Sequence, residues 1–394
     1  MNRLAEIIKH RANEIFNETV DLRRHLHMYP ELSYREKETS LFIARYLKNH
    51  KIKYSGNLAG YGLIATIEGR KKGNKVIALR AELDALPLSE ESGLDYSSRN
   101  KGIMHACGHD AHMAMLMSTA KVINGLRDEF GGTIAFIFQP AEELAPGGAI
   151  KLMKTPEFLE LNPDLIIAQH VLPGLESGKT GFREGIYMAS SDELHINIKG
   201  TGGHAALPSN STDQVLAGSE LVVELRKLPQ QYFPGEPIVL GIGRFIAEGA
   251  TNIIPEKAEI KGTLRTFDEN IRKEMHRRIN DTCSRISGKY HTGIDLHIPG
   301  GYPVLVNNEN FTRASVLLAK EINGDNNVVA LETRMSSEDF AHYSGSYPSV
   351  FYRLGIASGK DGRQGLHSPG FTLDEKALEA GVRTLTYLAL SYTN

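Results

Sequence analysis

Eight consecutive residues place the strongest constraint on how this chain folds. Residues 105–112 read His-Ala-Cys-Gly-His-Asp-Ala-His and contain one thiol, one carboxylate and three imidazoles. Thiolate and imidazole bind Zn²⁺, and imidazole also suits Mn, Co and Ni. The stretch follows an apolar run at 76–79, typical of a buried strand, and leads into an apolar run of helix length at 111–123. It predicts a metal site beside a sheet, with a polar loop of hydrogen-bonded histidines as the alternative.

The length and charge of the chain narrow the classes of protein that it can form. Its 394 residues exceed what one hydrophobic core usually organises, so we expect two domains. A net charge of −2 gives no general attraction to nucleic acid or anionic membranes. No segment approaches the ~20 apolar residues of a membrane span, and the first residues contain no apolar signal core. The only cysteines, Cys107 and Cys283, cannot form a disulfide framework, so we expect a reducing compartment, the cytoplasm.

Three apolar runs in the first half of the chain are expected to be buried strands, each followed by side chains that can bind a metal or transfer a proton. The side chains that follow these runs are Glu82 and Asp84 after 76–80, Glu142 and Glu143 after 133–138, and His170 after 165–168. Open α/β sheets bind ligands at the carboxyl ends of their strands. The sequence thus predicts that one sheet edge collects metal ligands and groups for proton transfer.

The adjacent Glu142 and Glu143 are the most informative pair. Successive residues at a strand end point in opposite directions, so one carboxylate can bind a metal while the other faces the open coordination position as a general base. Taken alone, the pair would be a solvated acidic turn, His170 a hydrogen-bonded core residue and His367 an exposed loop residue. The ligand candidates together are Cys107, His109, Glu143, His170 and His367. Five ligands are too many for one tetrahedral zinc but suit two ions.

The residue pattern changes near position 186. Leu194, Ile196 and Ile198 alternate with polar residues, as in a strand with one solvated face. The elements that follow are helices at 212–228 and 268–290 and strands at 238–247, 258–266 and 294–298. This order, βαββαβ, matches the ferredoxin-like split βαβ unit. We therefore expect a mixed-sheet α/β domain built from 1–185 and 300–394, with a βαββαβ domain inserted at 186–299.

Six short motifs occur in one order along the chain. They are Cys107-Gly-His109-Asp, Pro140-Ala-Glu142-Glu143, Ala168-Gln-His170, Gly202-Gly-His204-Ala-Ala, Ser337-Glu338-Asp339-Phe and Leu366-His367-Ser-Pro369. Each motif alone is weak evidence, but the ordered set is highly specific. It resembles the dinuclear metallo-amidohydrolases, which include hippurate hydrolase, bacterial N-acyl-L-amino-acid amidohydrolases, N-acetyl-diaminopimelate deacetylase and plant indole-acetyl-amino-acid hydrolases. The resemblance extends from about His25 to the final helix.

The resemblance implies roles for individual residues. Cys107, His109, Glu143, His170 and His367 would hold two divalent ions per chain (Zn, Mn, Co or Ni), with Glu142 as the general base. The inserted domain would form a homodimer interface and act as a lid, with a higher oligomer left open. His204 would reach the neighbouring subunit's active site and stabilise the oxyanion, and Asn252 and Arg265 would bind the substrate. Without the resemblance, Arg265 would be assigned to a solvated strand face.

Two positions depart from the family pattern. Glu82 stands where aspartate is more frequent, and Ala111 stands where glycine is common. Glu82 adds a methylene group near the site, and its role is open. Asp84 keeps the family residue and is expected to orient a ligand histidine.

The function implied by the resemblance is hydrolysis of the amide bond of N-acyl-L-amino acids. The acyl group would be acetyl, benzoyl or a related group, and the products would be a carboxylic acid and a free amino acid. Two alternatives stay open at this stage, a dipeptidase or carboxypeptidase-type metallopeptidase of the same fold and a non-catalytic metal-binding homologue. The expected partner is the small-molecule substrate, with no nucleic acid and no membrane.

Overall fold

The computed structural model describes residues 3–393, and these form two compact units. The first unit contains the chain up to Tyr187, then Val306–Glu332 and the residues from Asp339 onward. The second contains Met188–Leu305 and Thr333–Glu338. The sequence analysis expected the boundaries at 185/186 and 299/300. That each unit is a domain in its own right stays a prediction.

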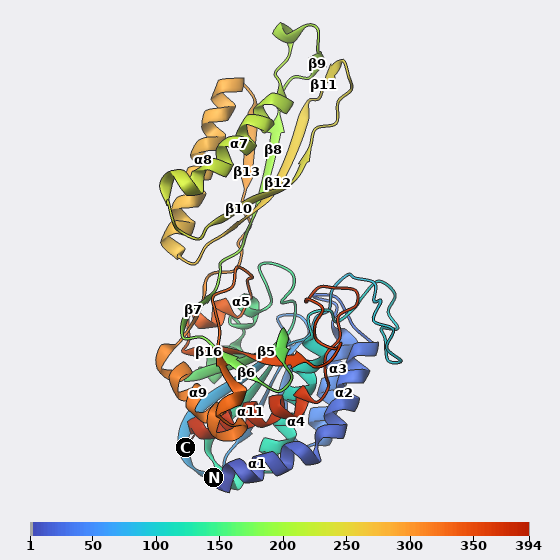
Figure 1. Cartoon of the computed structure of the whole chain (residues 1–394), viewed down its shortest axis with the longest axis vertical. Coiled ribbons are helices and arrows are strands. Elements are labelled where there is room, and N and C mark those ends of the chain that lie inside the picture. Colours follow the sequence, from blue (N-terminus) through green and yellow to red (C-terminus); the bar gives the residue numbers. More distant parts are fainter. Residues whose placement is uncertain (1–2, 394) are drawn as a thin grey trace. The chain divides into compact units, whose positions relative to one another are not determined.

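An eight-stranded mixed sheet organises the first unit (Figure 1). Its strands, in spatial order, are β1 (Lys53–Leu58), β2 (Gly62–Glu68), β4 (Gly131–Gln139), β3 (Lys71–Glu82), β5 (Leu165–Glu176), β16 (Ser349–Ala357), β6 (Thr180–Phe182) and β15 (Val328–Ala330). The predicted mixed-sheet α/β class is therefore confirmed.

The four central strands, β4, β3, β5 and β16, run parallel to one another. Their carboxyl ends consequently share one edge of the sheet, as the sequence predicted for the ligand-bearing runs. One detail differs, because β5 continues to Glu176, so His170 lies within a strand and not after its end. Pairing between β5 and β3 is recorded as far as Ala168, whereas β5 stays paired with β16 beyond His170.

The long helices of the first unit pack around one large apolar core. The long helices are α1 (Arg3–Glu14), α2 (Phe16–Met28), α3 (Lys37–Asn49), α4 (His109–Asn124), α9 (Glu309–Asn323) and α11 (Ala377–Thr393), and the short ones are α5 (Ala149–Leu152), α6 (Pro156–Leu161) and α10 (Ala341–Ser344). Within residues 3–393, no helix has the length and apolar character needed to cross a membrane. Helices α1 and α2 meet near Ile15.

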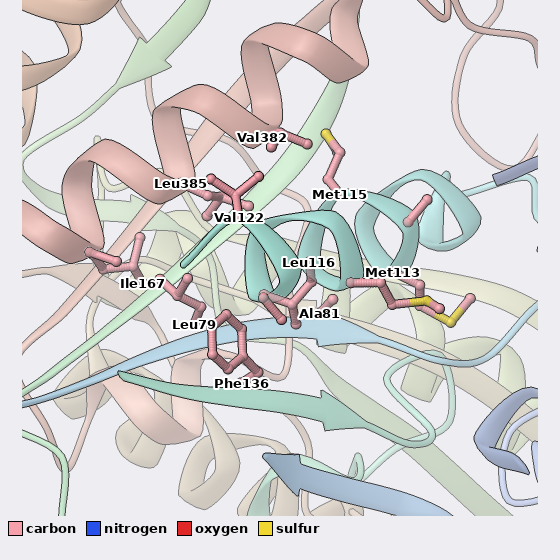
Figure 2. Packing of buried hydrophobic residues seen from close by; sticks show 14 of the residues in the cluster. Leu79, Ala81, Met113, Met115, Leu116, Val122, Phe136, Ile167, Val382 and Leu385 are labelled. Carbon is pink, nitrogen blue, oxygen red and sulfur yellow. The ribbon is translucent and has the colours of Figure 1, made fainter. Parts of the chain in front are cut away.

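Helix α4 lies at the centre of this core. Figure 2 shows its side chains packed against those of the central strands and of α11, with Leu116 close to Phe136. Almost every residue of α4 is buried. Each large apolar side chain that is fully buried contributes about 1.5–3 kcal/mol, so the position of this helix is strongly fixed.

The second unit is a four-stranded antiparallel sheet with two helices (Figure 1). The strands, in spatial order, are β10 (Val239–Ile246), β12 (Lys257–Arg265), β8 (Asp192–Lys199) and β13 (Gly293–His297), and the helices are α7 (Gln214–Tyr232) and α8 (Glu269–Tyr290). Leu194, Ile196 and Ile198 of β8 are buried in a core with both helices, as the alternation predicted. The small strands β9 (Gly203–His204) and β11 (Ile253–Ile254) pair with each other, and apart from them the order βαββαβ is confirmed.

Candidate active site and metal centre

Five side chains with metal-binding atoms gather at the carboxyl edge of the first unit's sheet. The Cys107 Sγ atom lies 3.5 Å from Nε2 of His170, and Nε2 of His367 lies 3.2 Å from Oε1 of Glu143. The same Oε1 is 4.0 Å from Nε2 of His109. The structure thus brings all five predicted ligands into one cluster, although they are up to 260 residues apart in sequence.

Helix α4 and its preceding turn place two of these ligands. Gly108 has φ +83°, and a Cβ atom there would lie 2.5 Å from a side-chain carbon of Val171. Only glycine fits this turn, which sets Cys107 just before the helix and His109 at its first position. The main-chain N–H of His367 donates to Ala106 O at 2.8 Å, which attaches the last ligand's loop to the same turn.

In two histidines, a hydrogen bond donated by Nδ1 leaves Nε2 as the ring nitrogen that can bind a metal. Nδ1 of His109 donates to the main-chain carbonyl of Asp84 at 2.8 Å, and Nδ1 of His170 donates to that of Val171 at 2.7 Å. In the neutral rings the Nε2 atoms therefore carry the lone pairs, as in histidines that bind metals. Nε2 of His109 and Oε1 of Glu143 are buried and have no hydrogen-bond partner among the described residues. Buried polar atoms are rarely left unpaired, so the donor set fits a bound cation.

The electrostatics of the cluster also favour a cation. Burial lowers the pKa of His109, but hydrogen bonding to Asp84 and the charge of Glu82 outweigh it and raise that pKa to about 10. Burial, together with the charges of Glu143 and Glu142, raises the pKa of the Cys107 thiol well above its usual range. Both shifts report excess negative charge in a desolvated site. A divalent ion would offset this charge and stabilise the thiolate.

Asp84 holds the turn that carries the two adjacent glutamates. This turn, residues 140–148, is called the carboxylate turn below. Oδ1 and Oδ2 of Asp84 accept from the main-chain N–H groups of Glu142 and Glu143 at 3.0 and 2.9 Å. Oε2 of Glu142 lies 4.0 Å from Nε2 of His109. Asp84 was expected to orient a ligand histidine, yet its carboxylate is 3.6 Å from Nδ1 of His109 and the 2.8 Å bond comes from its main chain.

His112 belongs to the site but was not assigned from the sequence. Its Nδ1 donates to Glu82 at 2.8 Å, and its Nε2 accepts the main-chain N–H of Val171 at 2.9 Å. Glu82 is also paired with the buried Arg80. Both ring nitrogens of His112 are used, so it supports the strand beside His170. Its spacing of three residues from His109, on one face of a helix, was the available signal.

The remaining predicted residues, His204, Asn252 and Arg265, belong to the second unit. His204 in β9 and Asn252 just before β11 are exposed beside the antiparallel strand pair β9–β11, where the N–H of Ala205 donates to Asn252 O at 3.0 Å. Arg265 ends β12, and its Nη1 donates to Met335 O at 2.9 Å. Burial lowers the pKa of its guanidinium.

The model of Peptidase family M20/M25/M40 matches residues 78–391. The chain belongs to this family. It is 37% identical to the protein YhaA of Bacillus subtilis strain 168, over the whole chain and 99% of that protein. It is also 37% identical to the N-acyl-L-amino acid amidohydrolase of Geobacillus stearothermophilus, over 77% of the chain and 81% of the relative. Other M20 relatives are named deacetylases and carboxypeptidases.

The solved structures agree with this assignment. The Bacillus subtilis protein YXEP, described as a dinuclear metal binding peptidase of the M20 family, superposes with a TM-score of 0.82 at 34% identity, over 97% of this chain and 99% of that one. The resemblance to metallo-amidohydrolases is therefore confirmed, and the protein is a metal-dependent hydrolase of the M20 family.

Proposed function

We propose that this M20 enzyme hydrolyses the amide bond of N-acyl-L-amino acids and releases a carboxylic acid and a free amino acid. The observation that carries the proposal is the carboxylate turn, where one glutamate lies among the ligand atoms and its neighbour lies beside them. The Geobacillus relative, at 37% identity, is named for this reaction. The acyl group and the amino acid are left open.

Cys107, His109, Glu143, His170 and His367 would hold two divalent ions, drawn from Zn, Mn, Co and Ni. Such ions act as Lewis acids and lower the pKa of water from 15.7 towards about 7. The buried Nε2 of His109, which has no hydrogen-bond partner among the described residues, supports this assignment, as does the position of Glu143 Oε1 between the Nε2 atoms of His367 and His109 at 3.2 and 4.0 Å. The paired ring nitrogens of His112 argue against it as a further ligand.

Glu142 would be the general base. Its side chain is almost fully buried, and Asp84 fixes its main chain. The carboxylate would accept a proton from the attacking water and then deliver it to the leaving nitrogen, so that the amine departs neutral. Burial favours both steps because it excludes bulk water as a competing proton acceptor.

The second unit would supply substrate contacts. In this proposal His204 stabilises the oxyanion at the neighbouring subunit's site, and Asn252 and Arg265 bind the carbonyl and α-carboxylate of the substrate. A guanidinium binds carboxylates through two parallel hydrogen bonds, and Met335 O already holds that of Arg265 in place. The exposed position of His204 suits a residue that acts on a partner.

A homodimer through the second unit follows from the same reasoning. Strand β10 is an edge of its sheet, with β12 on one side and no other strand among residues 3–393. Val215, Leu216 and Val223 of α7 and Phe245 of β10 are large apolar side chains exposed near this edge. Free edges and apolar patches mark association surfaces. A cytoplasmic location stays a prediction, supported by the two unpaired cysteines.

A peptidase acting on dipeptides or on peptide carboxyl ends is the second candidate, because relatives named carboxypeptidases also match. The test is amino-acid release from N-acetyl and N-benzoyl amino acids and from dipeptides. Purified protein would be stripped of metal and reloaded with Zn, Mn or Co, beside a Glu142→Gln variant. The proposal would be supported if the wild-type protein releases amino acids from acylated substrates and the Glu142→Gln variant does not. Release only from dipeptides would favour the peptidase, and no release with two metals bound would contradict both.

A further inference from the structure

The segment between α2 and α3, residues 33–36, contacts the machinery that holds the carboxylate turn. Ser33 Oγ donates to Oδ2 of Asp84 at 2.6 Å. Glu36 is completely buried, and its Oε1 accepts the main-chain N–H of Ala141 at 2.9 Å. These contacts join two parts of the chain that are about 100 residues apart in sequence. The proposed reaction assigns no role to either Ser33 or Glu36.

Glu36 accepts the first of three consecutive main-chain N–H groups that donate to carboxylates. The N–H groups of Ala141, Glu142 and Glu143 donate to Glu36 Oε1, Asp84 Oδ1 and Asp84 Oδ2 at 2.9, 3.0 and 2.9 Å. Successive N–H groups of this kind form a concave site for an anion. Two buried carboxylates of the protein itself fill that site here. The main chain is therefore fixed at the two glutamates and also at the residue before them.

The same oxygen stabilises two unfavourable backbone conformations. Ala141 has φ +54° and Tyr34 has φ +61°, in the left-handed region that residues with a Cβ atom rarely adopt. Oε1 of Glu36 accepts the N–H of both residues, each at 2.9 Å. The Tyr34 hydroxyl also donates to Gly147 O at 3.2 Å, at the far end of the carboxylate turn. Without the Glu36 carboxylate, the Ala141 N–H would lose this hydrogen-bond acceptor, and only the bond from the Gly148 N–H to Ala141 O would remain of the two.

The Glu36 carboxylate also has an energetic cost in the folded state. Burial, with a further contribution from the Asp84 charge, raises the pKa of Glu36 to about 7. Its Oε2 is buried and has no hydrogen-bond partner in the described chain. A buried charge near a like charge, with one oxygen unpaired, opposes folding.

We propose that Glu36 is a positioning residue for catalysis, which fixes the main chain at Ala141 and thereby holds the Glu142 carboxylate where it can transfer a proton. This inference rests on the proposed role of Glu142. The side-chain hydrogen bonds of Glu36 within the described residues go to the main-chain N–H groups of Tyr34 and Ala141 and not to ligand atoms. Its effect is therefore on the geometry of the turn.

The test compares Glu36→Ala with Glu36→Gln in the full-length, metal-loaded enzyme. Glutamine keeps an oxygen that accepts both N–H groups, whereas alanine removes it. Asp164→Ala is a matched control, because Asp164 Oδ2 also accepts a main-chain N–H, that of Val76 at 2.8 Å, next to the amino end of β5. Amide hydrogen exchange at 141–143 and the steady-state constants would be measured for each variant.

In Glu36→Ala, we expect faster exchange at 141–143 and a kcat about 10- to 100-fold lower, with KM nearly unchanged, since misplaced catalytic groups cost rates of this order. Glu36→Gln should restore most of both quantities, and Asp164→Ala should leave both unchanged. Unaltered exchange in Glu36→Ala would overturn the proposal. So would faster exchange with an unchanged kcat, or an equal loss of kcat in the control. If the wild-type enzyme releases no amino acid, the proposed function fails, while the exchange data still decide whether Glu36 fixes the turn.

Discussion

The two units carry their proposed functional residues in contrasting ways. In the first unit the ligand cluster is largely buried. His109 Nδ1 and the Glu142 N–H both donate to Asp84, and His170 Nδ1 donates to Val171 O of its own strand. In the second unit His204 and Asn252 are exposed beside the two-residue strand pair β9–β11. The contrast suggests that the first unit is preorganised within one chain, whereas the residues beside the β9–β11 strand pair are completed by substrate or by another subunit. Each prediction below tests one side of this contrast.

The largest expected effect tests the preorganised unit. Glu142→Gln removes the proton acceptor but keeps the size of the side chain, so kcat should fall by about 10²- to 10⁴-fold. Two metals should remain bound, because the ligand atoms are intact, and the thermal midpoint should change little. Steady-state kinetics with elemental analysis would measure both. A kcat within tenfold of wild type would show that another group takes the proton.

His204→Ala tests the exposed β9–β11 strand pair. If this imidazole stabilises the oxyanion, kcat should fall by about 10²- to 10³-fold. The fold should be unaffected, because the side chain is exposed.

Mixing this variant with Glu142→Gln shows which subunit His204 serves. A mixed dimer would have one site with Glu142 from one chain and His204 from the other, so equal mixing should restore about a quarter of the wild-type activity. Reassociation after dilution, followed by an activity assay, provides the measurement. If no activity returns although mixed dimers form, His204 acts within its own chain or not at all.

A smaller effect on activity is expected from a change at His112, which supports the metal site. His112→Ala removes the acceptor for the Val171 N–H and the donor to Glu82. Loss of such supporting contacts lowers metal affinity by about 10- to 100-fold. Competition with a chromophoric chelator would measure the affinity, and excess metal should restore most of kcat. A variant with unchanged affinity would show that His112 serves only the fold.

The sequence predicted the site best where metal-binding residues directly follow a predicted strand or begin a predicted helix. Glu143 and His170 follow apolar runs that form parallel strands, and Cys107 and His109 lie where the chain enters a buried helix. Their convergence at one sheet edge therefore followed from topology. Glu36 and His112 were missed because their roles depend on which main-chain N–H groups lie nearby. Those contacts join segments distant in sequence, and no periodic pattern encodes them.

Arg265 is expected to show the smallest effect and tests how far the second unit determines substrate binding. Its Nη1 is held by Met335 O, with Ser337 Oγ at 3.4 Å, which leaves the rest of the guanidinium available for a carboxylate. Arg265→Lys keeps the positive charge but loses the two-bond geometry, so KM should rise about tenfold with a smaller change in kcat. Substrates whose α-carboxylate is replaced by an amide should lose this difference, because they lack the group that arginine recognises. If KM rises equally for both classes of substrate, Arg265 supports the fold of the second unit and does not bind the substrate's carboxylate.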